Sequence, residues 1–304
     1  MAVAIADVAL LTDHRYTAST AAADDWYLDN ILSDDRLLQA ALEARGISSL
    51  RVDWADPHID WSQFRLAVFR TTWDYFDRWA EFSSWLQAVK SQTKLCNDYA
   101  TVRWNTDKHY LADLQTRGVN TVPSHFVERG CRVSLPELLA TTGWENAVIK
   151  PCVSGAARHT YRVNQHNADT INSIMQELLA AESLILQPFQ QHILDHGEET
   201  LMVFNGRYSH AVRKVAKPGD FRVQDDHGGK AFSYQPTAEQ IELAERAMSV
   251  CDRLPVYGRV DMIRDNAGEL AIMELELIEP ELWLRFHPPA AVPFAAAIVE
   301  QLEA

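Results

Sequence analysis

An acid-rich hairpin near the C-terminal end of the chain carries the clearest chemistry in the sequence. Two strand-forming runs meet there around a turn that we place between Ala267 and Gly268. Side chains alternate between the two faces of a strand, so counting outward from this turn puts four charged residues on one face. The opposed pairs on that face are Asp261 with Glu274 and Arg259 with Glu276.

The charged face of this hairpin is a candidate metal site. Ile263 and Ile272 flank the charges on the same face, which indicates that water does not reach them freely. Three carboxylates held together repel one another and lose hydration unless a cation compensates. Oxygen ligands favour Mg²⁺ or Mn²⁺, so Asp261, Glu274 and Glu276 are the candidate ligands. A solvated face with one arginine balancing the acids is the alternative. The opposite face is expected to hold Val260, Met262, Met273, Leu275 and Leu277.

An earlier hairpin opposes an acid and a base. Asn205 and Gly206 are flanked by strand formers, and Asn-Gly is the strongest short hairpin signal. If these two residues form the turn, counting outward places Glu198 opposite Arg213. The two charges are therefore expected to face each other at the open end of the hairpin.

Two lysines lie where an anion would suit them. Lys150 ends an apolar strand, and Lys108 falls in the first turn of a helix that we expect to begin behind Thr106. A helix dipole disfavours a cation at that end unless an anion is near. Small residues at Ser154 and Gly155 let backbone N–H groups approach phosphate oxygens. Solvated lysines are the alternative. The sequence has no G-x-x-x-x-G-K-[ST] and no G-x-S-x-G, which excludes a P-loop and a nucleophile elbow.

The elements that position these groups begin with an α/β segment over residues 1 to 100. Its expected strands are 3–11, 49–52 and 66–69, and its expected helices are 34–44 and 77–89. This alternation predicts a mostly parallel sheet covered on both faces, whose ligands bind beyond the carboxyl ends of the strands. The segment directly after the third strand is therefore placed where a ligand would bind. The alternative is a loop whose aromatic side chains pack on the sheet. That segment is Arg70, Thr71, Thr72, Trp73, Asp74 and Tyr75.

The rest of the chain mixes helices with antiparallel hairpins. Strands are expected at 147–151 and 184–187, and helices at 168–181 and 238–252. The fold class is therefore α/β, with an α+β C-terminal part.

Composition excludes several classes of protein. The 304 residues include 28 Lys and Arg against 42 Asp and Glu, a net charge of −14, and 47% are hydrophobic. A disordered chain, a collagen and a small disulfide scaffold are excluded, and the acidic balance argues against a nucleic-acid partner. The four cysteines form no C-x-x-C, so we expect reduced thiols and a cytoplasmic protein. The apolar N-terminus carries Asp7 and no basic residues, so we expect a strand there, with no signal peptide and no membrane partner.

Taken in order, these pieces resemble the ATP-grasp superfamily, in the branch of glutathione synthetase and RimK-like ligases, over about residues 100 to 290. The segments 70–75, 219–224 and 274–280 are similar to the subgroup that includes the D-cycloserine-forming cyclo-ligase. The motifs that carry the resemblance are Asn105-Thr106-Asp107-Lys108, Val148-Ile149-Lys150-Pro151, Ser154-Gly155, Gln187-Pro188-Phe189-Gln190, Gly197-Glu198, Arg213-Lys214, Arg259-Val260-Asp261 and Glu274-Leu275-Glu276.

The resemblance implies three domains: a pre-ATP-grasp parallel-sheet domain at 1–100, a small ATP-grasp lobe at 101–190 and a large lobe with the metal site at 191–304. It implies ATP and Mg²⁺ (or Mn²⁺) as cofactors. The nucleotide-binding residues that it implies are Lys108, Lys150, Ser154, Gly155, the adenine-reading hinge Gln187, Pro188, Phe189 and Gln190, then Asp195 or Glu198 at the ribose, and Lys214. The catalytic residues that it implies are Lys150, Arg213 and Arg259, and Arg222 joins residues 70–75 on the substrate side.

Two departures from the family pattern concern the phosphate loop and the metal site. Ala156 and Ala157 stand where relatives are often richer in glycine, and Glu276 replaces the usual Asn, which adds a negative charge. The resemblance implies an ATP-dependent ligase that forms an acylphosphate and then an amide or a ring. The loops 151–160 and 215–230 are its candidate lids.

The expected substrate is a small, amino-acid-like carboxylate, and the chain is compatible with homo-oligomerisation. A non-catalytic ATP-binding regulatory protein is the alternative function. A two-metal hydrolase using the same acids would leave the lysines unexplained, and histidine ligands are not evident at useful spacing.

Overall fold

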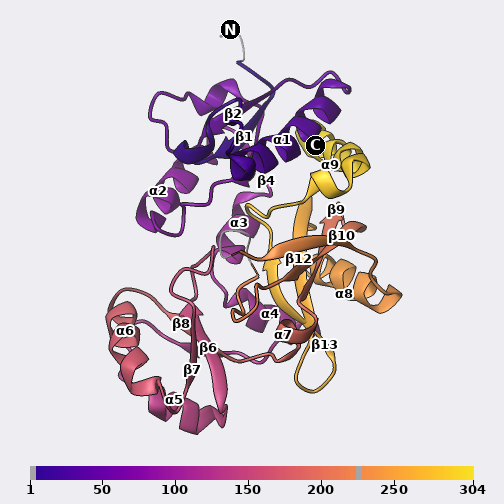
Figure 1. The fold of residues 1–304 in the computed structure, drawn as a ribbon. Coiled ribbons are helices and arrows are strands. Elements are labelled where there is room, and N and C mark those ends of the chain that lie inside the picture. The colour runs from indigo at the N-terminus through magenta and orange to yellow at the C-terminus, as the bar shows by residue number, and fades with distance from the viewer. Residues whose placement is uncertain (1–4, 224–227) are drawn as a thin grey trace.

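The N-terminal segment forms a parallel sheet, as its alternating pattern predicts. The computed structural model describes residues 5–223 and 228–304 of the chain. The sheet has the order β2-β1-β3-β4, and it forms the N-terminal end of the molecule in Figure 1. Its elements are β1 (Val8–Thr12), α1 (Trp26–Glu43), β2 (Ser49–Asp53), β3 (Leu66–Thr71), α2 (Trp79–Val89) and β4 (Lys94–Cys96). Of the strand expected at 3–11, residues 3–4 lie outside the described residues and the strand itself begins at Val8.

The helix predicted behind Thr106 is present, but its predicted N-cap is wrong, because the chain makes two short helices around that residue. These are α3 (Tyr99–Asn105) and α4 (Tyr110–Thr116). Thr106 ends α3, and its hydroxyl donates to the carbonyl of Arg103 at 2.8 Å. Lys108 therefore lies in the turn between the helices, directly before α4 and not in its first turn.

A four-stranded antiparallel sheet follows, with the order β5-β8-β6-β7. Its strands are β5 (His125–Val127), β6 (Asn146–Pro151), β7 (Tyr161–Asn164) and β8 (Leu184–Pro188). Its helices are α5 (Leu135–Thr142) and α6 (Ala168–Ala181), and α6 confirms the predicted range. The helices cover one face of this sheet and bury Met175 and Leu179 against it (Figure 1).

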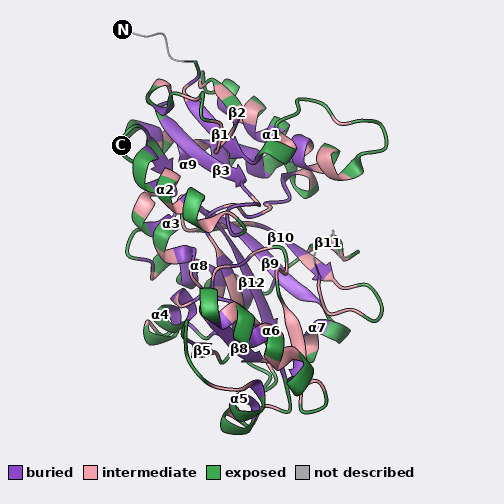
Figure 2. Ribbon diagram, turned by 90° about the vertical axis from the view of Figure 1, so that its left-hand side faces the viewer, coloured by how far each residue is buried: buried purple, intermediate pink, exposed green. Residues whose placement is uncertain are grey.

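The third sheet carries both predicted hairpins, in the order β11-β10-β9-β12-β13. Its strands are β9 (Glu198–Phe204), β10 (Arg207–Val215), β11 (Lys230–Tyr234), β12 (Tyr257–Arg264) and β13 (Leu270–Glu276), and its helices are α7 (His192–Asp195) and α8 (Ala238–Ser249). One face packs on α8 and on α4, where Leu111 and Leu114 join the core. The purple strands and green outer helix faces of Figure 2 show this layering.

The C-terminal helix returns to the first sheet. Helix α9 (Ala291–Glu303) packs along α1, and both contribute to one core with β1 and β3. Phe294 stacks on Phe204 of β9 with ring centroids 4.7 Å apart. This helix therefore fixes the N-terminal sheet to the five-stranded sheet. Within the described residues, every helix is too short or too polar to cross a bilayer.

Candidate active site

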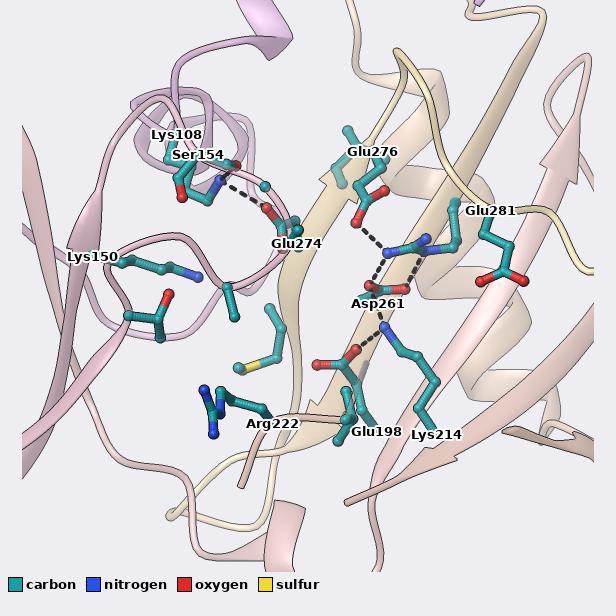
Figure 3. Close-up of a pocket in the computed structure, with 18 of the residues that line it drawn as sticks. Lys108, Lys150, Ser154, Glu198, Lys214, Arg222, Asp261, Glu274, Glu276 and Glu281 are labelled. Carbon is teal, nitrogen blue, oxygen red and sulfur yellow. Dashed lines mark hydrogen bonds and ion pairs between the residues drawn. The ribbon is translucent and has the colours of Figure 1, made fainter. Parts of the chain in front are cut away.

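Residues of the two antiparallel sheets and of the loops and helices of the N-terminal domain line one cavity of about 300 Å³. The acidic hairpin forms one wall, as predicted: Asp261 pairs with Glu274 and Arg259 with Glu276 in the strand register. The Arg259 guanidinium donates to Asp261 at 2.8 and 3.0 Å and also pairs with Glu276 (Figure 3). Although burial opposes it, Arg259 helps to hold the pKa of Asp261 well below its usual range.

A bulge in this hairpin corrects part of the predicted register. The pairing shifts by one residue after Asp261, so Met262 lies opposite Ile272 and Ile263 opposite Ala271. Met273 consequently lines the cavity, whereas it was expected on the opposite face. The rest of that apolar face is confirmed, with Val260, Met262, Leu275 and Leu277 in the core beside α8.

A second bulge, in the β9–β10 hairpin, places Lys214 at the position predicted for Arg213. The predicted turn is confirmed, but the register shifts near Ser209, so Lys214 lies opposite Glu198. Lys214 Nζ is 2.8 Å from Asp261 Oδ2 and also pairs with Glu198. The predicted pairing of Arg213 with Glu198 is therefore wrong. Arg213 pairs instead with Glu199 at 3.1 Å and does not line the cavity.

The two predicted lysines both line the cavity, Lys108 beside the acidic wall and Lys150 on the opposite wall. Lys108 Nζ is 2.9 Å from Glu274 Oε1 and donates to the carbonyl of Ser154 at 2.7 Å. Lys150 lies on β6 and points into the cavity (Figure 3). Among the described residues it has no hydrogen-bond partner and no carboxylate within 4.0 Å. Burial lowers the pKa of Lys150, and the nearby Lys108 lowers it further.

The small-residue loop after Lys150 lies against the N-terminal sheet domain. A Cβ on Gly155 would lie 2.5 Å from the ring of Phe76, so only glycine fits this contact. Ala156 and Ala157 have φ of 47° and 55°, the left-handed region that favours glycine. Ser154 Oγ donates to the carbonyl of Arg158 at 3.0 Å, which closes the loop.

The hinge predicted at the end of β8 lines the cavity between the two sheets. Gln187 and Gln190 are both buried there, and Phe189 packs below the guanidinium of Arg162 at 3.8 Å. Glu198 also lines the cavity. Asp195 does not, because it is exposed on α7.

The predicted substrate segment divides into buried and lining residues. Trp73 and Tyr75 line the cavity, but Arg70, Thr72 and Asp74 do not. Arg70 lies inside β3, which extends to Thr71, and its guanidinium pairs with Asp35 at 2.9 Å in the core. Thr72 is fully buried. Asp74 accepts from Trp54 at 2.8 Å and from Arg78 at 2.7 Å, so it anchors α2.

The candidate loop 215–230 enters the site from the large lobe. Arg222 lines the cavity (Figure 3), and it pairs with Asp220 at 2.8 Å. Residues 224–227 of this predicted lid lie outside the described residues.

Several lining residues escaped the sequence analysis. Aromatic and charged residues from η1 (His14–Tyr16), from α1 and from the chain after β13 close the cavity, although none of them was predicted as a site residue. They are Arg15, Tyr16, Tyr27, Glu279, Glu281 and Trp283. An acid directly before Pro280, just beyond a strand end, was the available signal for Glu279.

The acidic wall fits a divalent cation. Its donors are carboxylate oxygens, the set that Mg²⁺ prefers. Burial raises the pKa of Glu276 to about 7 and that of Glu198 to about 7, in spite of their cationic neighbours. A positive ion beside these carboxyl groups would balance charge that the side chains leave uncompensated.

A separate group of metal-type ligands lies outside this cavity. One atom each of Asp107, His109 and Cys152 lie within 4.8 Å of one another. His109 Nε2 is also 3.0 Å from Glu128. The spacing of histidines in the sequence did not indicate this cluster, and none of its members lines the pocket.

Comparisons with known proteins agree with this geometry. Residues 8–97 match the N-terminal domain of D-cycloserine synthetase DcsG, and residues 132–273 match the ATP-grasp domain of prokaryotic glutathione synthetase. The cycloserine biosynthesis protein DcsG of Streptomyces lavendulae is 34% identical over 88% of this chain and 93% of its own. The crystal structure of D-cycloserine synthetase DcsG has a TM-score of 0.85 at 32% identity, over 97% of this chain and 99% of that one. The ATP-grasp ligase PsnB, complexed with a precursor variant, Mg and ADP, shares the fold with a TM-score of 0.62 at 16% identity, over 98% of this chain and 99% of its own.

Proposed function

The chain belongs to the family of ATP-grasp ligases that includes the cycloserine biosynthesis protein DcsG, and from this premise we propose that it activates a small amino-acid-like carboxylate with ATP and closes it into a cyclic amide. ATP-dependent formation of a carbon–nitrogen bond is the activity of this family. The observation that carries the proposal is one cavity in which an acidic wall meets two lysines, of which Lys108 is buried and Lys150 partly buried.

The chemistry proceeds in two displacements. A carboxylate oxygen of the substrate attacks the γ-phosphorus of ATP and displaces ADP, which gives an acylphosphate. A nitrogen of the same molecule then attacks the acyl carbon, loses a proton and displaces inorganic phosphate. Phosphate is a far better leaving group than hydroxide, and water must be excluded so that the acylphosphate is not hydrolysed.

The nucleotide would lie between the two walls. Lys150 and Lys108 would neutralise phosphate oxygens, the backbone at 187–190 would read adenine, and Glu198 would face the ribose. Arg259 and Lys214 would stabilise charge on the transferring phosphoryl group. Asp261, Glu274 and Glu276 would hold Mg²⁺, which when bound neutralises charge on the phosphates. Mn²⁺ has the same preference for oxygen and is the second candidate ion.

We propose the three predicted domains with one changed boundary, at helices α3 and α4. Residues 1–100, 101–190 and 191–304 would be the pre-ATP-grasp domain, the small lobe and the large lobe. Helices α3 and α4 pack on the five-stranded sheet, however, so they act as part of the large lobe. Loops 151–160 and 215–230 would close over the nucleotide.

Release of ADP is the test. The purified chain is incubated with Mg·ATP and a panel of D- and L-amino acids and their side-chain derivatives. Glu274→Gln should lower ADP release at least ~100-fold, while Glu269→Gln, exposed in the β12–β13 turn, should not change it. Wild-type ADP release from Glu274→Gln would contradict the metal assignment. Tight binding of Mg·ATP with no ADP release from any compound would favour a non-catalytic regulatory protein.

A further inference from the structure

The charges that line the cavity are almost all neutralised by other side chains. Each acid except one lies within 4.0 Å of a cation. These pairs are Glu198–Lys214, Asp261–Arg259, Glu274–Lys108, Glu276–Arg259 and Glu281–Arg285. The exception is Glu279, which has no cationic side chain within 4.0 Å among residues 5–223 and 228–304.

The backbone that presents Glu279 is held firmly on both sides. The indole N–H of Trp73 donates to the carbonyl of Glu279 at 2.8 Å. The hydroxyl of Tyr257 donates to the carbonyl of Ile278 at 2.6 Å, and the N–H of Leu277 donates to Asn105 at 2.8 Å. The backbone at Glu279 is therefore fixed before any ligand arrives, which limits where its side chain can reach.

The surroundings of Glu279 suit an ammonium group better than a metal ion. Trp73 and Tyr75 line the cavity beside it, and aromatic faces attract ammonium ions. Burial, with repulsion from Glu276, raises the pKa of Glu279 to about 8. Burial, followed by the charge of Glu279, raises the pKa of Tyr75, which indicates that the two side chains are close. The candidate metal ligands lie on β12 and β13, whereas Glu279 lies beyond the end of β13.

We propose that Glu279 binds the ammonium group of the substrate and thereby restricts this ligase to aminated carboxylates. This inference rests on the proposed function and adds to it the residue that selects for the amine. Lys150, on the opposite wall, has no anionic partner among the described residues and is assigned to ATP phosphate. Lys150 and Glu279 thus each lack a side-chain partner of opposite charge among the described residues, and a substrate with a carboxylate and an ammonium group would span the space between the phosphates and Glu279.

Binding measurements with a matched pair of probes test the assignment. D-Cycloserine carries a primary amine, and isoxazolidin-3-one is the same ring without it. Both are titrated calorimetrically into wild-type protein, Glu279→Gln, Glu279→Asp and the exposed control Glu269→Gln, each with saturating Mg·ADP. A charge-assisted hydrogen bond of the usual strength predicts that wild-type protein binds D-cycloserine about 10- to 100-fold more tightly than the amine-free ring.

Glu279→Gln should lose this preference while retaining its affinity for isoxazolidin-3-one and for Mg·ADP. Glu279→Asp, which keeps the charge, should retain part of it. If a variant fails to fold, the preference of the wild-type protein for D-cycloserine over isoxazolidin-3-one still tests whether the site recognises the amine. Equal binding of D-cycloserine by wild-type and Glu279→Gln would overturn the Glu279 assignment and leave the proposed function standing. A loss of Mg²⁺ affinity in Glu279→Gln would overturn it in favour of a metal ligand. If wild-type protein bound neither ring, the cyclic product itself would be wrong.

Discussion

The two walls of the cavity treat their buried charges differently. On the five-stranded sheet, Asp261 lies within 3.0 Å of both Arg259 and Lys214, so this buried carboxylate is paired with cations of its own sheet. On the four-stranded sheet, Lys150 has no carboxylate within 4.0 Å among the described residues. A wall with paired charges is stabilised during folding, whereas a wall with an unpaired ammonium gains its partner from a ligand. The first therefore acts as a rigid support, and the second as the side that responds to nucleotide.

The sharpest test of this contrast replaces each lysine in turn. Lys108→Met leaves the Glu274 carboxylate, 28% exposed, without its cation, and should cost about 2–4 kcal/mol of unfolding free energy. Lys150→Met removes a partly buried unpaired charge, so its stability should be unchanged or rise by about 1 kcal/mol. Both variants should lose ADP release by at least ~100-fold. Urea unfolding without ligand gives the stabilities. Equal destabilisation by the two variants would remove the distinction between the walls.

The second test concerns the two neighbouring cations of β10. Lys214 joins Glu198 to Asp261, so Lys214→Met should leave two buried acids facing each other and lower ADP release by ~100-fold. Arg213 is 36% exposed and pairs with Glu199 on the other face of the sheet, away from the cavity. Arg213→Met should therefore change ADP release by less than about threefold. Steady-state rates of ADP release at saturating ATP measure both effects. A larger loss in Arg213→Met than in Lys214→Met would mean that the bulge does not exist in solution.

This pair of cations also marks how far the sequence could be taken. The Asn205-Gly206 turn was predictable because its backbone preference is local. The bulge near Ser209 was not, since one unpaired residue leaves no mark in composition or periodicity, yet it moves each later side chain to the other face. The same reason explains why Met273 was misplaced.

Other parts of the site depended on packing between distant segments. The helix at 168–181 was predictable because its apolar spacing is regular. Arg70 was expected in a loop, but the apolar run of β3 does not show where the strand ends, and Asp35 on α1 captures the guanidinium in the core. Contacts such as this one form only when segments 35 residues apart in the chain pack together.

The third test concerns the pH dependence of the unfolding free energy, through a buried histidine in the core that supports the five-stranded sheet. His210 on β10 is buried beneath the chain that follows β13, and its Nε2 lies 2.8 Å from the carbonyl of Leu282. Burial lowers the pKa of His210 to about 4, whereas the unfolded chain binds a proton below about 6.5. Stability present above pH ~6.5 should therefore be lost as pH falls toward 4, by about 1–3 kcal/mol.

The matched variant for this test is His210→Gln, whose amide can still donate to the carbonyl of Leu282. Its unfolding free energy should be below that of wild-type protein at pH 7, and the difference should narrow as pH approaches 4. Urea midpoints at pH 7, 6, 5 and 4 measure this. A constant difference across the range would show that His210 is not kept neutral by burial.

The smallest effect concerns backbone strain on the responsive wall. Ala157 has a φ of 55° in the phosphate loop, where alanine costs about 1–2 kcal/mol relative to its preferred conformation. Ala157→Gly should therefore raise the unfolding free energy by about 0.5–1 kcal/mol, after the greater flexibility of glycine in the unfolded chain is counted. Ala88→Gly, in the exposed part of α2, should lower it by about 1 kcal/mol. If the two Ala→Gly substitutions change the unfolding free energy in opposite directions, the difference reports the backbone strain at Ala157. A loss of stability in Ala157→Gly as large as that of Ala88→Gly would mean that the loop is unstrained, and that Lys150 alone distinguishes this wall from its neighbour.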